Sequence, residues 1–303
     1  MDIDAFRRLP ADRIADMVRT QGPKVGVFPI NGTRRWFLLE HAAGQADPLK
    51  AYLEVSEQRH IELYRMFFEH GVDTLLTPIF GPDLLERGDE YVQMAAEGLT
   101  RIVQAPHFLA FYRDYDVRVR FYGDHRKYLQ ATPYAYLSDL FDEITAQTLH
   151  HRRSRLFFGV FAHDAAETTG ELAIQYHQSH GHAPDKRTLV ELYYGEDVPP
   201  VSFFIGFDKF CSFDMPLIAS GNEDLYFTVS PSPYLTEEQL RDILYDHMFT
   251  RRDSEPDYET LTPDEWAGMR AFYHAHRGRT CGVGALKKGN YWYPLPQVES
   301  GGE

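Results

Sequence analysis

The sequence predicts an α/β protein with a central, mostly parallel sheet of six strands and helices on both faces. Short apolar runs rich in β-branched and aromatic residues recur along the chain, and patterns of helical period separate them. That alternation is typical of parallel strands joined by helical crossovers. Neither a Pro/Gly/Ser-rich linker nor an internal repeat interrupts the 303 residues, so we predict a single catalytic domain over 1–303.

The apolar runs give the six strands in chain order. They cover 24–30, 73–79, 117–122, 155–161, 201–207 and 224–229. The accompanying helices are expected at 11–20, 48–70, 84–104, 134–149, 163–180 and 236–251.

Several residues mark helix ends. Thr236 followed by Gln239 is a capping-box pattern, and Gly71 is typical of a helix stop. Gly170 is interpreted as a packing site inside a helix. A last helix is expected to start at Thr262, with Pro263 in its first turn.

Composition limits the classes of function. A hydrophobic fraction of 43% with 25% charged residues is typical of a folded globular protein. The net charge is −14, from 31 Lys and Arg against 45 Asp and Glu, so the average surface repels nucleic acid and anionic lipid. We expect no nucleic-acid partner, and an anionic substrate needs a local basic pocket.

Targeting signals are not recognisable. Cys211 and Cys281 are too few for a disulfide framework, and the first residues lack the layout of a signal peptide. No apolar stretch approaches the roughly 20 residues of a membrane span. We therefore expect a cytoplasmic enzyme without an integral membrane segment.

One strand end carries two adjacent arginines. If the first strand passes through Asn31, Gly32 and Thr33 into a helix, free backbone N–H groups lie where an anion can bind. Arg34 and Arg35 add forked donors suited to phosphate oxygens. The residues alone leave two interpretations open, an anion site or surface charges at a helix start. The segment is neither a Walker loop nor a Gly-x-Gly-x-x-Gly turn.

This segment resembles the diphosphate-binding signature of the cis-prenyltransferase fold, a strand followed by Asp-Gly-x-x-Arg-Trp. Residues 22–37 are most similar to the branch of tuberculosinyl adenosine transferases, tuberculosinol synthases and kolavelool synthases. The likeness runs nearly end to end. Further similar segments are 68–72, 77–80, 85–91, 121–124, 158–161, 164–167, 194–196, 220–221, 225–229 and 243–247.

The resemblance implies a diterpene synthase that ionises a bicyclic C20 diphosphate of the kolavenyl (clerodane) or tuberculosinyl (halimane) type. Water would then capture the allylic cation and give a tertiary diterpene alcohol. One alternative is transfer of the terpenyl group to adenosine, and another is a non-catalytic binding subunit. The resemblance also implies a homodimer and Mg²⁺ as cofactor.

It further implies the site residues. Gly32, Thr33, Arg34 and Arg35 would hold the diphosphate, with the arginines stabilising charge on the leaving group. Tyr52 and Tyr91 would line the hydrocarbon side, where either hydroxyl could orient the nucleophile. An unperturbed phenol, with a pKa near 10, is a poor base.

Asn31 departs from the family pattern, which has an aspartate at the position expected to engage Mg²⁺ or the diphosphate. Asparagine keeps the shape and loses a charge, and one unit charge at 4 Å is worth about 4 kcal/mol at an effective dielectric near 20. Strong metal binding at Asn31 is therefore doubtful. Two explanations stay open, a natural variant that relies on the arginines or a substitution introduced to stop turnover.

The hydrocarbon needs an apolar cavity that excludes water. Its walls are expected on the helix from Asp47 to His70 and on the turn around Phe80 to Tyr91, although most aromatic residues of the chain belong to the core. Chain-elongating relatives bind a second diphosphate with arginines beside a Ser-Gly pair. Residues 216–223 contain the pair without arginine, which favours a reaction of one diphosphate.

Overall fold

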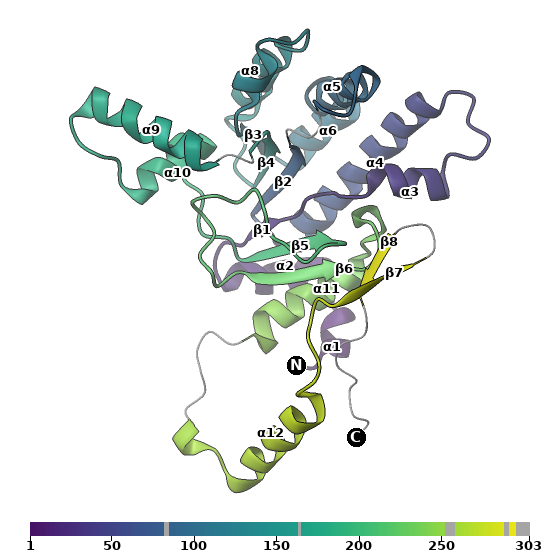
Figure 1. The fold of residues 1–303 in the computed structure, drawn as a ribbon, viewed down its shortest axis with the longest axis vertical. Helices are drawn as coiled ribbons and strands as arrows, with labels where there is room; N and C mark the ends of the chain where they lie inside the picture. The colour runs from purple at the N-terminus through teal and green to yellow at the C-terminus, as the bar shows by residue number, and fades with distance from the viewer. Residues whose placement is uncertain (82–84, 163–164, 252–257, 288–290, 295–303) are drawn as a thin grey trace.

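The fold is that of an α/β protein with one large parallel sheet (Figure 1). A computed structural model describes the chain except for residues 82–84, 163–164, 252–257, 288–290 and 295–303. Six strands run in the order β3-β4-β2-β1-β5-β6, and every neighbouring pair is parallel. The strands are β1 (Val25–Val27), β2 (Thr74–Phe80), β3 (Val117–Tyr122), β4 (Ser154–Val160), β5 (Phe203–Phe207) and β6 (Asp224–Thr228). The predicted class and strand count are confirmed, whereas the one-domain assignment stays a prediction.

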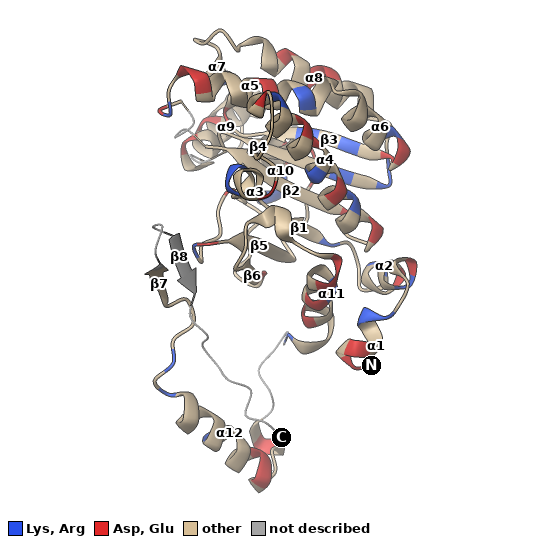
Figure 2. Ribbon diagram, turned by 90° about the vertical axis from the view of Figure 1, so that its right-hand side faces the viewer, with Lys and Arg blue, Asp and Glu red and all other residues tan. Residues whose placement is uncertain are grey.

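Most helices pack around this sheet. They are α1 (Ile3–Arg7), α2 (Ala11–Thr20), α3 (Thr33–Glu40), α4 (Pro48–Glu69), α5 (Asp89–Gln104), α6 (Pro106–Asp114), α7 (His125–Leu129), α8 (Tyr136–Thr148), α9 (Ala165–His180), α10 (Lys186–Tyr194) and α11 (Glu237–Tyr245). Helix α12 (Pro263–His276) and an antiparallel hairpin of β7 (Gly284–Lys287) and β8 (Tyr291–Pro294) follow. Figures 1 and 2 both show α12 apart from the sheet and its helices.

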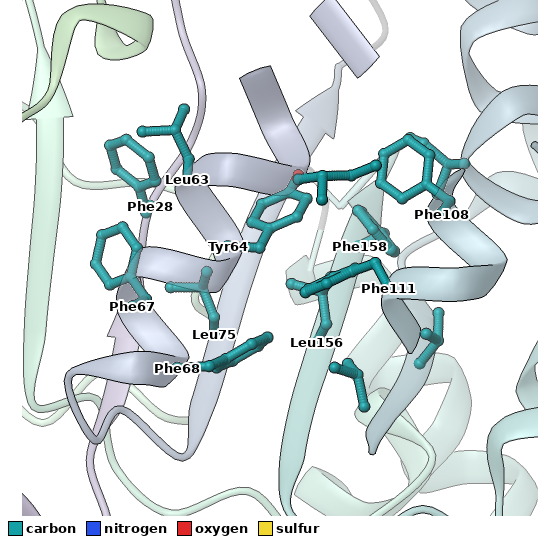
Figure 3. Close-up of a cluster of buried hydrophobic side chains, with 14 of the residues drawn as sticks. Phe28, Leu63, Tyr64, Phe67, Phe68, Leu75, Phe108, Phe111, Leu156 and Phe158 are labelled. Atoms are coloured by element: carbon teal, nitrogen blue, oxygen red, sulfur yellow. The ribbon is translucent and has the colours of Figure 1, made fainter. Parts of the chain in front are cut away.

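The strands bury side chains on both faces, as the period of two requires. In β4, Leu156 and Phe158 belong to the core beneath α4, α5, α6 and α8, while Phe157 faces a second core beneath α10. Figure 3 shows part of the first core, where Tyr64 and Phe67 of α4 pack over the strands. Full burial of such side chains contributes about 1.5–3 kcal/mol each.

The strand order places a crevice at the carboxyl ends of β1 and β5. From β1 the chain continues to β2 on one side, and it later returns to β5 on the other side of β1. At such a switch point the connections leave the carboxyl ends of adjacent strands in opposite directions, so a ligand-sized gap opens between them. The segments after β1 and β5 border this gap.

Element boundaries differ from the predictions where local chemistry intervenes. Strand β1 ends at Val27, and although the Phe28 N–H still donates to Leu76 O at 2.8 Å, Pro29 has no N–H to continue the ladder. Helix α5 begins at Asp89 rather than 84, since Gly88 has a backbone φ of 90° that no helix contains; residue 84 lies outside the described residues.

Several helix ends behave as predicted. Thr236 and Gln239 form a reciprocal capping box at α11, as Thr262 does with Glu265 at α12, where Pro263 is the first residue. Helix α11 ends at Tyr245, six residues before the predicted end, and a π-helical turn, Asp246–Thr250, follows it.

Two glycine predictions have opposite outcomes. Gly71 follows the end of α4 with a left-handed φ of 91°, which confirms the helix stop. The packing role assigned to Gly170 is wrong, because a Cβ there would have no heavy atom within 4 Å. Helix α9 has no buried residue among those described, so nothing packs against this glycine.

The sequence also predicted no membrane span. Within the described residues, no helix is both long enough and apolar enough to cross a bilayer.

The two glycines provide a matched stability test. A Cβ at Gly71 would lie 2.7 Å from Ala15 O, so we expect Gly71→Ala to force α2 and α4 apart and lower the free energy of unfolding by about 3 kcal/mol. Gly170→Ala should raise it by about 0.5–1 kcal/mol, because alanine favours an open helical position. Urea denaturation with an unchanged m-value measures both. Equal midpoints for the two variants would contradict the assignment.

Candidate active site

The candidate site begins where the chain leaves β1. The loop is fixed by Ser232, whose N–H donates to Asn31 O at 3.0 Å and whose hydroxyl accepts from Asn31 N–H at 3.1 Å. The Ser232 hydroxyl also donates to Pro29 O at 3.2 Å, and the Thr33 hydroxyl donates to Ile30 O at 3.1 Å. These bonds hold the backbone of Asn31 at the mouth of the crevice while its side chain stays exposed.

Gly32 makes the turn from the loop into α3. Its φ of 78° is left-handed, and an added Cβ would lie 2.9 Å from Pro231 Cβ and 3.0 Å from Phe207 Cε1. Gly32 is the N-cap of α3, and no side chain caps the helix. The first-turn N–H groups are therefore available to an anion, and the helix dipole adds positive potential there.

Basic residues lie at this helix start (Figure 2). Arg35 Nη2 lies 3.8 Å from Asp208 Oδ2, with its guanidinium 5.4 Å from the Phe207 ring centroid. Arg87 Nη1 donates to the Tyr91 hydroxyl at 3.1 Å, and its guanidinium lies 5.0 Å from that ring centroid.

Arg34, Arg35 and Arg87 all line a cavity of about 720 Å³, a size typical of small-ligand sites. Among its described lining residues, Asp214 is the one carboxylate. The local charge is thus positive in a chain whose net charge is −14. An anionic group is the ligand that this corner suits.

Apolar walls continue from the basic corner. A second hollow of about 530 Å³ shares Arg34, Tyr52, Arg87 and Tyr91 with the first and adds apolar contacts from α3 and α4. A smaller cavity of about 90 Å³ between α4, α5 and α6 is lined mainly by apolar side chains. Its described lining residues are Tyr52, Leu53, Ser56, Glu57, His60, Ile79, Phe80, Tyr91, Met94, Ala95, Gly98, Arg101, Ile102 and Phe108. The combined space suits an amphiphile with an anionic head and an apolar body.

Burial in this wall shifts the pKa values of two side chains of α4. Burial raises the pKa of the Tyr52 phenol, and the nearby Tyr91 adds to the increase. Burial and, to a smaller extent, the charge of Arg59 lower the pKa of His60 to about 4. At neutral pH the phenol is therefore protonated and the imidazole is uncharged.

His60 also carries an unpaired polar atom. Its Nε2 is buried and has no hydrogen-bond partner within the described part of the chain. Leaving a buried donor or acceptor unpaired costs about 1–3 kcal/mol. Glu57, which also lines the small cavity, is buried but paired. It lies 2.9 Å from Arg101 Nε and 3.2 Å from His107 Nδ1.

A magnesium ion does not fit the donor atoms of the corner well. Mg²⁺ prefers one or two carboxylates together with phosphate oxygens. Here the residue at the strand end is the amide Asn31, the surrounding side chains are arginines, and Asp208 is close to Arg35. Within the described ranges, no three His, Cys, Asp or Glu side chains gather where they could hold a metal. We derive no step through a metal.

Comparison with known proteins gives two relatives of nearly the same length. A tuberculosinyl adenosine transferase of Mycobacterium tuberculosis is 42% identical over 290 residues, 95% of this chain and 96% of the relative. The chain belongs to the tuberculosinyl adenosine transferase family. A (+)-kolavelool synthase of Herpetosiphon aurantiacus is 26% identical over 91% of both chains. No protein-family model matches.

Solved structures confirm the fold of this transferase-family chain. The lavandulyl diphosphate synthase of Lavandula x intermedia, crystallised with dimethylallyl diphosphate, superposes with a TM-score of 0.60 at 15% identity. The superposition covers 80% of this chain and 98% of the synthase. A probable undecaprenyl diphosphate synthase of Campylobacter jejuni gives 0.55 at 14% identity, over 78% and 99%. The cis-prenyltransferase fold predicted from the sequence is thereby confirmed.

The structure brings the predicted site residues into one place. The 720 Å³ cavity is lined by Asn31, Gly32, Thr33, Arg34, Arg35, Tyr52 and Tyr91. The chemical roles assigned to them stay predictions. Thr33 is buried with its hydroxyl used inside the loop, so its backbone N–H is the group that remains for a ligand.

Two basic lining residues, His60 and Arg87, were not predicted from the sequence. Arg87 precedes Tyr91 by four residues, but in the sequence it is one of many arginines. His60 follows Tyr52 by eight residues, which is two helical turns plus a fraction and therefore the same face of α4. Because Tyr52 and His60 share a face of α4, His60 could have been identified from Tyr52 before the structure was known.

The alternative interpretations of the arginine pair can be separated by binding. We expect Arg34→Gln and Arg35→Gln each to weaken the binding of inorganic diphosphate by about 10- to 100-fold, the loss of a charged hydrogen bond. Isothermal calorimetry at fixed ionic strength measures this. Arg13→Gln, an exposed position on α2, is the control. Unchanged affinity in the double variant would identify both arginines as surface charges.

Proposed function

We propose that this chain transfers a terpenyl group from a bicyclic C20 diphosphate to a nucleoside of the adenosine type. The observation that carries the proposal is that the basic cavity at the uncapped start of α3 and the apolar cavity beside α4 and α5 share the lining residues Tyr52, His60, Ile79, Phe80 and Tyr91. A terpenyl diphosphate has the same division into an anionic head and an apolar body.

The comparisons guide the choice of nucleophile. The 42%-identical relative is named for transfer to adenosine, whereas the relative named as a kolavelool synthase is 26% identical. The nucleoside alternative is therefore favoured over the water capture predicted from the sequence, and water capture becomes the second candidate.

The proposed reaction starts with loss of diphosphate. The bond between the allylic carbon and the bridging oxygen breaks, and its electron pair leaves with the diphosphate. Arg34, Arg35 and the first-turn N–H groups of α3 hydrogen-bond the oxygens on which negative charge grows, an interaction stronger in the transition state than in the bound substrate. Arg87, held over the Tyr91 ring, adds a third positive charge at the mouth.

The carbocation is then shielded until a nucleophile reaches it. The aromatic residues Tyr52, Phe80 and Tyr91 line the wall, and an aromatic ring face is worth about 0.5–2 kcal/mol to a nearby cation. A lone pair of the nucleophile closes the new C–N bond in nucleoside transfer, or the new C–O bond in water capture. The choice depends on which molecule the polar groups of the wall hold.

A homodimer is the quaternary structure that we propose with this function. The apolar residues Trp266, Phe272 and Tyr273 of α12 are 42%, 51% and 61% exposed, which supports coverage by a second copy. Sedimentation equilibrium tests the dimer without affecting the proposal on chemistry.

Incubation with tuberculosinyl and kolavenyl diphosphates, with and without adenosine, tests the function. We expect adenosine to be consumed and a terpenyl nucleoside to dominate the products by mass spectrometry. A terpene alcohol as the main product in the presence of adenosine would identify water as the nucleophile. Absence of diphosphate release in every incubation, including those with the Asn31→Asp variant, would instead favour a binding subunit.

Asn31 allows a separate test of the metal. Asn31→Asp adds a carboxylate beside the diphosphate, so we expect the Mg²⁺ concentration for half-maximal turnover to fall at least about tenfold. Titration of turnover with Mg²⁺ against EDTA measures the shift. Asn31→Ser, which removes the amide without adding charge, is the control, and equal Mg²⁺ curves for Asn31→Asp and Asn31→Ser would contradict the expectation.

A further inference from the structure

His60 is the basic side chain shared by the polar and the apolar parts of the cavity. The described residues that line both parts are Tyr52, His60, Ile79, Phe80 and Tyr91. Two of them are apolar and two are phenols. A group that captures the cation has to lie at this junction, because the carbon that loses diphosphate lies between the anionic head and the apolar body of the substrate.

The phenols are less suited to hold a nucleophile through a lone pair. The Tyr91 oxygen already accepts a hydrogen bond from Arg87 at 3.1 Å. The Tyr52 phenol is half-buried and remains protonated, because desolvation raises its pKa. A protonated phenol donates well but accepts a proton poorly.

The imidazole has the complementary properties. An uncharged imidazole has one donor nitrogen and one acceptor nitrogen, and burial keeps His60 uncharged by holding its pKa at about 4. Its Nε2 is unpaired among the described residues. Its ring is half-buried and lies 6.2 Å from the Tyr64 ring, and it projects from a helix that is packed in the core, so the helix holds it at the junction and a small rotation of the ring brings the buried Nε2 to a ligand.

We propose that the His60 imidazole is a catalytic residue that accepts a hydrogen bond from the incoming nucleophile and holds it against the allylic cation. This inference rests on the proposed terpenyl transfer and adds the group that selects capture over elimination. The hydrogen comes from an N–H of the nucleoside base in transfer, or from an O–H in water capture.

The step balances in atoms and charge. The nucleophile supplies an electron pair to the cation and forms one new bond. If the attacking atom carries a hydrogen, that proton passes to the imidazole and then to the released diphosphate. If the attacking atom is a ring nitrogen without hydrogen, no proton leaves and the positive charge stays on the base. Without capture, the cation instead loses a proton from a neighbouring carbon to diphosphate and becomes a hydrocarbon.

The test compares two rates in the intact protein. His60→Leu keeps a similar volume without an acceptor, and His60→Gln keeps an amide oxygen. With a C20 diphosphate and adenosine, diphosphate release gives the rate of ionisation. The ratio of captured products to hydrocarbons gives the partition of the cation.

For His60→Leu we expect the captured fraction relative to hydrocarbon to fall at least about tenfold, the equivalent of one hydrogen bond, while diphosphate release changes by less than about threefold. His60→Gln should recover part of the captured fraction. Tyr64→Phe, one turn further along α4, removes a buried hydroxyl next to His60 and should behave like the native protein. A structural defect would lower both rates together and would not shift their ratio.

An unchanged product ratio in His60→Leu would overturn the inference, and so would a parallel loss of release and capture. The proposed function fails separately, when the native protein releases no diphosphate. In that case calorimetry with adenosine in the presence of inorganic diphosphate decides the role of His60. Affinity about tenfold weaker in His60→Leu supports it, and equal affinity overturns it.

Discussion

The geometry of Gly32 is the constraint on which the site depends. Its left-handed backbone turns the loop that follows β1 into the first turn of α3, and the contacts of Pro231 and Phe207 leave no room for a Cβ. Because the turn is this tight, the uncapped start of α3 and the two arginines that follow lie directly outside the crevice between β1 and β5. A larger residue would move the helix start away from the strands and separate the N–H groups from the guanidinium groups.

The same constraint explains how an acidic chain can bind an anion. A net charge of −14 repels a diphosphate at long range, but this repulsion is screened beyond about 10 Å at 0.1 M salt. Inside the cavity, three arginines and a helix dipole act at contact distance, opposed by Asp214 among the described lining residues. Contact interactions therefore decide binding, and the overall charge affects mainly the rate of approach.

The sequence predicted the parts of the fold that obey a local rule. Strand 117–122 and helix 11–20 have their predicted bounds, because their periodicity ends at clear turn residues. The short helices α1, α6, α7 and α10 were missed, since none is longer than nine residues and so few turns give no clear helical period. The site residues divide in the same way, into those that a local motif reveals and those that the fold brings together. Adjacent Arg34 and Arg35 are visible as a motif, whereas Arg87 joins them only through tertiary packing, which no local pattern encodes. His60 is an intermediate case, because its spacing from Tyr52 on α4 is a local signal.

Helix α4 connects the stability of the fold to the chemistry proposed for the site. One of its faces places Tyr64 and Phe67 in the main core (Figure 3). The neighbouring face presents Tyr52 and His60 to the cavity. His60 keeps an unpaired nitrogen in the cavity wall, so the helix that carries it has to hold its position when no ligand is bound. Core packing on the neighbouring face of the helix provides that support. The His60 nitrogen can therefore stay unpaired in the free protein and pair with a ligand when one binds. The free-energy cost of the unpaired state then favours ligands that donate a hydrogen bond.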